Sequence, residues 1–172
     1  MAGKTPYQAV QNFLAPLRRA ISCVSRAVIK HGGKEYELNA GPYALVVGGK
    51  CRLKRDPSLT LDIRVQYKIV EASGDRGPYK VTSTAYMYIV DDHQGHEVFS
   101  YHWQPDGLTV KFPHLHVEHP HFKKAHFPTG RISLEEVLRL LIVDFGVRPL
   151  RSDWDKILTE THQKFATYRT WG

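Results

Sequence analysis

The chain has 172 residues, a length typical of one domain with a sizeable core, so we expect a single domain over residues 1–172. Hydrophobic residues make up 42% of it and charged residues 24%, a composition that excludes a disordered chain. No apolar run reaches the roughly 18 residues of a membrane helix, and the two cysteines cannot form a disulfide framework. We therefore expect a cytoplasmic protein that does not bind a membrane.

Positive charge is in excess. The 24 lysines and arginines outnumber the 17 acidic residues, which gives a formal net charge of +7. Eight of the ten histidines also lie between His93 and His126. A basic balance favours RNA or another polyanion as a partner, and a solvated basic surface without a partner is the alternative. Nothing in the composition indicates an oligomeric state.

The N-terminal segment carries a helical pattern. Thr5 and Pro6 fit the N-cap and first helical position. Arg19 and Arg26 lie nearly opposite the apolar stripe of this helix, so we expect them to contact RNA or an acidic partner. The alternative is that they form only the solvent-exposed face of a helix packed on the core. The stripe consists of Val10, Leu14, Leu17, Ile21, Val24 and Val28.

The middle of the chain carries strand patterns joined by short connections, which favour an antiparallel sheet. The clearest is 61–69, where apolar and polar residues alternate. Gly48 and Gly49 interrupt the first apolar run, and 104–107 is a strong turn signal. The predicted strands lie within 43–53, 61–69, 81–90, 98–103, 108–112 and 115–117.

The last third is predicted to be helical. Ser133 and Glu136 fit a capping box, and the apolar face from Leu134 to Phe145 ends at Gly146. Ser152 is predicted to open a second helix. The sequence thus predicts an α+β protein: an antiparallel β-sheet with an N-terminal helix and two C-terminal helices.

Common catalytic motifs are absent from the sequence. Ala44 and Cys51 occupy positions where a phosphate-binding loop around Gly49-Lys50 needs Gly and Ser or Thr. Neither a G-x-S-x-G nor an H-E-x-x-H motif occurs. The histidine triad of nucleotide hydrolases fails at its third position, which is Glu118.

The informative segment is 112–121. On a strand, His114 and His116 share one face with Glu118, while Leu115 and Val117 share the other. Three interpretations stay open: structural histidines at a sheet edge, a metal site, or general acid–base catalysis on a phosphodiester. His102, His121 or His126 could complete a zinc tetrahedron, but cysteine or acidic co-ligands are missing, so we expect neither a metal nor another cofactor.

Acid–base cleavage needs a base, an acid and a cation for the phosphate. His114, His116 and His102 are the catalytic candidates, and Arg131 and His126 are the phosphate-contacting ones. A hairpin with two or four loop residues would place His114 opposite Tyr101, whereas a three-residue loop or a bulge would place it opposite His102.

A family resemblance rests on three stretches of the sequence: 101–103 (Tyr-His-Trp), 112–116 (Phe-Pro-His-Leu-His) and 132–138 (Ile-Ser-Leu-Glu-Glu-Val-Leu). Together they resemble the small TumE-like toxin family over residues 96–142. The resemblance implies a toxin–antitoxin component that acts on RNA, with an antitoxin protein as partner, and it carries catalytic roles only to His114 and His116. We therefore expect a toxin-like or defence-associated, metal-independent endoribonuclease. The alternatives are a non-catalytic module that binds nucleic acid or a partner, and a histidine-based metal-binding protein.

Overall fold

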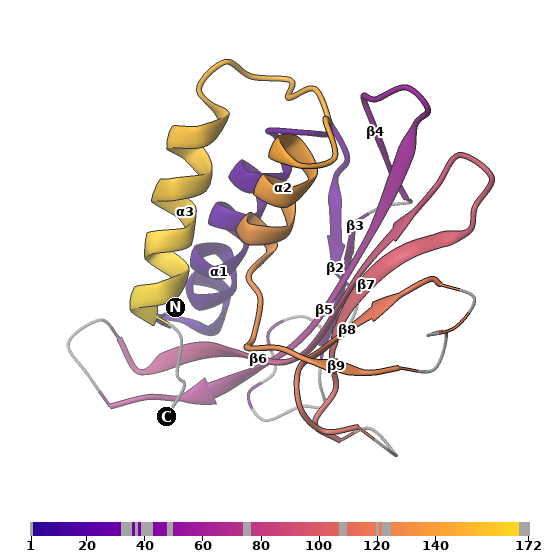
Figure 1. The fold of residues 1–172 in the computed structure, drawn as a ribbon. Coiled ribbons are helices and arrows are strands. Elements are labelled where there is room, and N and C mark those ends of the chain that lie inside the picture. Colours follow the sequence, from indigo (N-terminus) through magenta and orange to yellow (C-terminus); the bar gives the residue numbers. More distant parts are fainter. Residues whose placement is uncertain are drawn as a thin grey trace.

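A computed structural model describes residues 2–31, 36, 38, 43–47, 50–73, 77–106, 110–119, 121 and 125–168. Within these residues the chain forms a nine-stranded antiparallel sheet and three helices that pack together on one side of it (Figure 1). The other face of the sheet is left open by the helices. This arrangement confirms the predicted α+β class, with an N-terminal helix and two C-terminal helices.

The strands follow the order β2-β3-β5-β6-β7-β8-β9, and β1 and β4 pair with β6 and β5. Their bounds are β1 Ala2–Gly3, β2 Ile29–His31, β3 Tyr43–Val47, β4 Cys51–Leu53, β5 Leu59–Glu71, β6 Tyr79–Asp91, β7 Glu97–Trp103, β8 His114–Val117 and β9 Phe127–Pro128. The longest pair, β5 and β6, forms the centre of the sheet.

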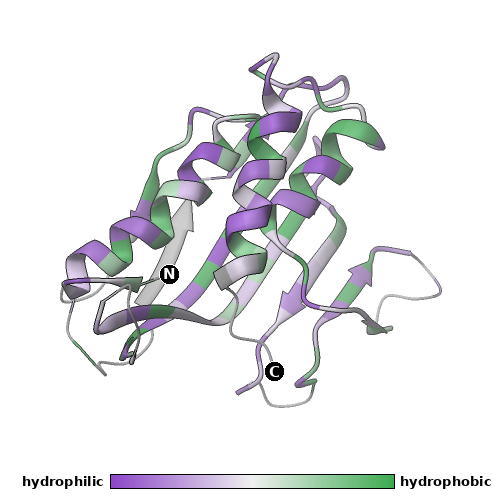
Figure 2. Ribbon diagram, turned by 90° about the vertical axis from the view of Figure 1, so that its left-hand side faces the viewer, coloured by the Kyte–Doolittle hydropathy of each residue, from purple (hydrophilic) through white to green (hydrophobic). Residues whose placement is uncertain are grey.

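Alternation along the strands decides which side chains face the helices. On β5, Leu61, Ile63 and Val65 are buried. Arg64 and Gln66, which alternate with them toward the end of the strand, are exposed. Figure 2 shows hydrophobic and hydrophilic residues alternating along the strands and around the helices. The hydrophobic core therefore fills the layer between the sheet and the helices.

Helix α1 (Pro6–Ile21) begins as predicted, since the Thr5 side chain accepts a hydrogen bond from the backbone N–H of Gln8. It is shorter than the apolar stripe that predicted it. The helix ends at Ile21, Val24 is buried beyond its end, and Val28 is 71% exposed. Arg26 therefore lies outside the helix. The prediction extended too far because the apolar spacing in the sequence continues beyond the last helical turn.

Helices α2 (Leu134–Val143) and α3 (Trp154–Tyr168) form the rest of the helical layer. The predicted capping box of α2 is present, and Gly146, with φ of +68°, follows the helix end. Helix α3 begins at Trp154, two residues after the predicted start. No helix in the described part of the chain is both long and apolar enough to cross a membrane.

One predicted strand was wrong: residues 110–112 are not in a strand. They belong to the connection between β7 and β8, where Pro113 cannot donate a backbone hydrogen bond. The predicted interruption at Gly48 and Gly49 and the residues 107–109 lie outside the described residues. The flanking run does form two strands, β3 and β4, which both pair with β5.

The cap of α2 gives a stability prediction. The Ser133 hydroxyl accepts the backbone N–H of Glu136 at 3.2 Å and lies 3.0 Å from Nδ1 of the His162 ring on α3. Ser133→Ala removes both interactions inside the helical layer, so we expect a loss of about 1–2 kcal/mol in the free energy of unfolding. Urea denaturation measures it. Ser152→Ala, at an exposed position, is the control and should change stability by less than about 0.5 kcal/mol.

Candidate functional site: a four-histidine cluster on the open face of the sheet

The pairing of β7 with β8 brings the histidines of distant segments together. His102 lies opposite His114, and Ser100 lies opposite His116. Phe99 and Trp103 on β7 belong to the hydrophobic core, so His102 between them points to the open face. The structure therefore settles the register that the sequence left open, with a ten-residue connection, 104–113, in place of a tight turn.

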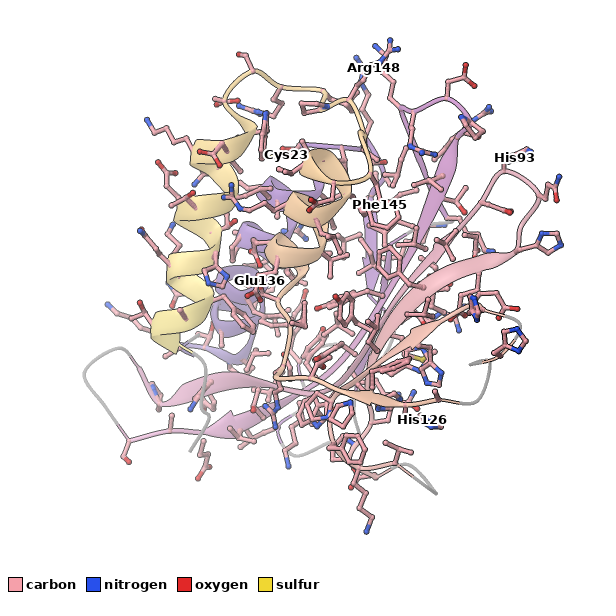
Figure 3. The ribbon with its side chains drawn as sticks, viewed as in Figure 1. Cys23, His93, His126, Glu136, Phe145 and Arg148 are labelled. Atoms are coloured by element: carbon pink, nitrogen blue, oxygen red, sulfur yellow. The ribbon has the colours of Figure 1, made fainter. Side chains whose placement is uncertain are left out.

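Four imidazole rings form one connected group at this position, in which His114 and His116 each contact the other three. We call them the four-histidine cluster: His102, His114, His116 and His126. Ring centroids of His102 and His116 are 4.8 Å apart, as are those of His114 and His116. His126, just before β9, lies 4.5 Å from His116 and 4.9 Å from His114. In Figure 3, His126 lies on the side of the sheet away from the helices, and His93 lies at the far end of the β6–β7 hairpin.

Two of the ring nitrogens have distinctive surroundings. His114 is 5% exposed, and its Nδ1 lies 2.8 Å from the carbonyl oxygen of Phe112. Because a carbonyl only accepts hydrogen bonds, Nδ1 carries a proton, and in the neutral ring Nε2 then holds the lone pair. The buried Nε2 of His102 has no hydrogen-bond partner among the described residues. Such a buried polar atom is costly unless something else satisfies it.

Burial and crowding favour the neutral form of two imidazoles in the cluster. Burial, with smaller contributions from His116, His114 and His126, lowers the pKa of His102 to about 4. Burial also lowers the pKa of His116, again helped by His114 and His126 and opposed by Glu97. Both rings are therefore neutral near pH 7, with a lone pair available for a proton or a metal ion.

The cluster continues into a row of side chains across the open face. His102 lies opposite Met87 on β6, and Met87 lies opposite Arg64 on β5. Arg64 is exposed and forms an ion pair with Asp62 at 2.6 Å. Lys68, four residues farther along β5, is also exposed. The open face beside the cluster thus carries two exposed cationic side chains, and Arg64 is shared between its Asp62 partner and solvent.

A pocket of about 200 Å³ lies beside this row on the open face. Gln104, two residues after His102, lines it and contacts the Met87 sulfur at 3.1 Å. The other lining residues are Gln66, Thr84, Ala85, Pro105 and Asp106. The pocket is therefore lined by amide, hydroxyl and carboxylate groups, and it lies beside the end of β7, the strand that carries His102.

The other residues predicted for the site lie elsewhere. The Arg131 guanidinium stacks 3.3 Å from the centre of a Trp103 ring, on the core side of β7, and so does not join the cluster. Arg19 forms a 2.9 Å ion pair with Glu160 between α1 and α3. Arg26 is exposed after the end of α1. The structure thus brings together His102, His114, His116 and His126 and separates them from these three arginines.

Sequence reasoning missed Arg64 and Lys68 as candidate binding residues. The signal was present, because they share the polar face of the clearest alternating strand. What the pattern lacked was the strand order that places β5 and β6 beside β7 and β8.

No family model, curated protein or solved structure matches this chain.

Proposed function

We propose that the protein acts on RNA, binding it across the open face of the sheet and cleaving a phosphodiester bond at the four-histidine cluster. The observation that carries this proposal is the connected group of four imidazoles on an open sheet face, in a row with the exposed Arg64. Imidazole is the side chain best suited to proton transfer near neutral pH. The excess of positive charge suits a polyanionic substrate.

The reaction is an internal transesterification of the RNA, in which one imidazole takes a proton from the substrate and a neighbouring imidazole gives one to it. His116 and the exposed His126, with ring centroids 4.5 Å apart, are the pair that a substrate reaches most directly. Neutral His116 takes the proton of the ribose 2′-hydroxyl as its oxygen attacks phosphorus. As the bond from phosphorus to the 5′-oxygen breaks, protonated His126 gives its proton to that leaving oxygen. The products are a 2′,3′-cyclic phosphate and a free 5′-hydroxyl.

The other two members of the cluster position this pair. His114 is held through Nδ1 by the Phe112 carbonyl and contacts both His116 and His126. His102 packs against His116 from β7. A toxin role with an antitoxin partner is part of the proposal; it is supported by the resemblance over 96–142, whose His102, His114 and His116 belong to the cluster.

Charge reversals on the two sides of the molecule test where RNA binds. Arg64→Glu/Lys68→Glu alters the open face, and Arg19→Glu/Arg26→Glu alters the matched control positions outside it. Two lost phosphate contacts should reduce the slope of log affinity against log salt by about 1.4 and lower affinity at 0.1 M salt about 25-fold. We expect this from the open-face pair only. Fluorescence anisotropy with 2′-O-methyl RNA, which cannot be cleaved by this route, measures affinity at several salt concentrations.

Equal losses of RNA affinity in the two double variants, or a larger loss in Arg19→Glu/Arg26→Glu, would contradict binding across the open face. Cleavage is assayed separately, with unmodified RNA and wild-type protein in a chelator. Binding without cleavage under these conditions would overturn the endoribonuclease proposal and favour the non-catalytic binding module.

A further inference from the structure

We infer that His102, His114 and His116 form a binding site for one divalent transition-metal ion, with Zn²⁺ as the fitting ion and His126 at the border of the site. The inference goes beyond the proposed RNA cleavage, because it assigns a second ligand to the cluster. It also departs from our sequence-based expectation that no metal binds.

The first argument is the convergence of donors. One ligand nitrogen from each of His102, His114 and His116 lies within 4.8 Å of the other two. Tetrahedral zinc with Zn–N bonds of 2.0–2.1 Å places its ligand nitrogens about 3.4 Å apart. Rotation of the imidazoles about their side-chain bonds can close this difference without moving the strands. The ring of His126 contacts His114 and His116 and borders the site, although it is not one of the three converging donors.

The second argument is the unsatisfied Nε2 of His102. This atom is buried and has no hydrogen-bond partner among the described residues, although a buried polar nitrogen normally has one. A metal ion between the rings would satisfy it through its lone pair. Two imidazoles lie close to it on the open face, since His114 is its strand partner on β8 and the ring of His116 is 4.8 Å away.

The third argument is the hydrogen bond behind His114. A metal-binding histidine usually donates its other ring N–H to a carbonyl or carboxylate, which fixes the tautomer and orients the ring. Nδ1 of His114 makes this contact with the Phe112 carbonyl at 2.8 Å. The lone pair of Nε2 is thereby left for the cluster.

The donor chemistry selects the class of ion. Three imidazoles suit Zn²⁺, Co²⁺, Ni²⁺ and Cu²⁺, whereas Mg²⁺ and Ca²⁺ prefer oxygen ligands. Among the described residues that converge here, no carboxylate or thiol belongs to the group. Both cysteines are buried elsewhere, Cys51 on β4 and Cys23 against the start of α3.

Metal binding and proton transfer exclude each other at any one imidazole nitrogen. A lone pair donated to an ion cannot take a proton from a ribose hydroxyl. The metal inference is therefore tested by binding in the absence of RNA, and the proposed function by cleavage in a chelator.

The experiment is a titration of chelator-treated, dialysed full-length protein. Calorimetry with ZnCl₂ should give about one ion per chain, and CoCl₂ should give visible absorption bands of a tetrahedral site. His102→Ala and His116→Ala should each weaken binding by at least about 10²-fold. His93→Ala, an exposed histidine in the turn between β6 and β7, is the matched control and should bind as wild type does. Far-UV circular dichroism establishes that each variant is folded.

Failure of the wild-type protein to bind Zn²⁺ stoichiometrically would overturn the inference. So would binding that is retained in folded His102→Ala and His116→Ala, because the ion would then sit elsewhere. Neither result affects RNA cleavage by the metal-free protein. Conversely, Zn²⁺ binding without any RNA cleavage would leave the metal site standing and remove the proposed function.

Discussion

Replacing His116 by alanine is expected to lower the rate of RNA cleavage by about 10²-fold or more, the usual cost of losing a general base. His116 contacts the other three rings of the cluster. Its loss therefore removes the base and also the ring contacts that hold the other three imidazoles in place. His126→Ala should cost a similar factor by removing the general acid. Both are measured as single-turnover rates on a short RNA in the presence of a chelator.

His93→Ala is the control for this series and should cleave at the wild-type rate, since the ring is exposed in the turn between β6 and β7. The cleaved 3′ end should carry a 2′,3′-cyclic phosphate, which mass spectrometry identifies. Wild-type rates for both His116→Ala and His126→Ala would show that proton transfer does not take place at this cluster.

The second large effect concerns stability. Leu138 lies in α2 with 0% of its surface exposed, inside the core shared by the sheet and the helices. Leu138→Ala removes buried methyl groups and leaves a cavity, so we expect the free energy of unfolding to fall by about 2–5 kcal/mol. Chemical denaturation followed by circular dichroism gives the value.

Leu150→Ala provides the matched comparison, because Leu150 is 43% exposed between α2 and α3. Its substitution should change the free energy of unfolding by less than about 0.5 kcal/mol. A loss below about 1 kcal/mol at Leu138 would mean that α2 does not anchor the helical layer as its burial indicates.

The fold was predictable where side-chain periodicity and capping agree. Ser133 and Glu136 mark the start of α2 by sequence alone, and the alternation of 61–69 marks the centre of β5. Two-residue strands such as Ala2–Gly3 were not predictable, because two residues carry no period. The end of α1 was missed for the opposite reason: Val24 is buried, and so fits the apolar stripe, although it lies past the last helical turn.

The site was predictable in its residue types but not in its geometry. His114 and His116 share a face on any strand, so their pairing follows from spacing. That His102 joins them depends on the strand register, which the connection 104–113 does not specify by length. Arg131 follows the histidines in sequence, yet its stacking on Trp103 commits it to the other side of β7. Nearness along the chain was a poor guide to which cation shares the open face.

The register of β7 and β8 has a consequence for how this protein tolerates insertions and deletions. Additional residues within 104–113 would lengthen the connection and leave the facing of both strands unchanged. Deleting a single residue inside β8 would instead turn every side chain beyond it to the opposite face of the sheet. A deletion of Leu115, for example, would leave His114 in place, direct His116 into the core and bring Val117 outward. Deletion of one codon in β8 would therefore disrupt the cluster, whereas the insertion of several codons in the preceding connection would leave it intact.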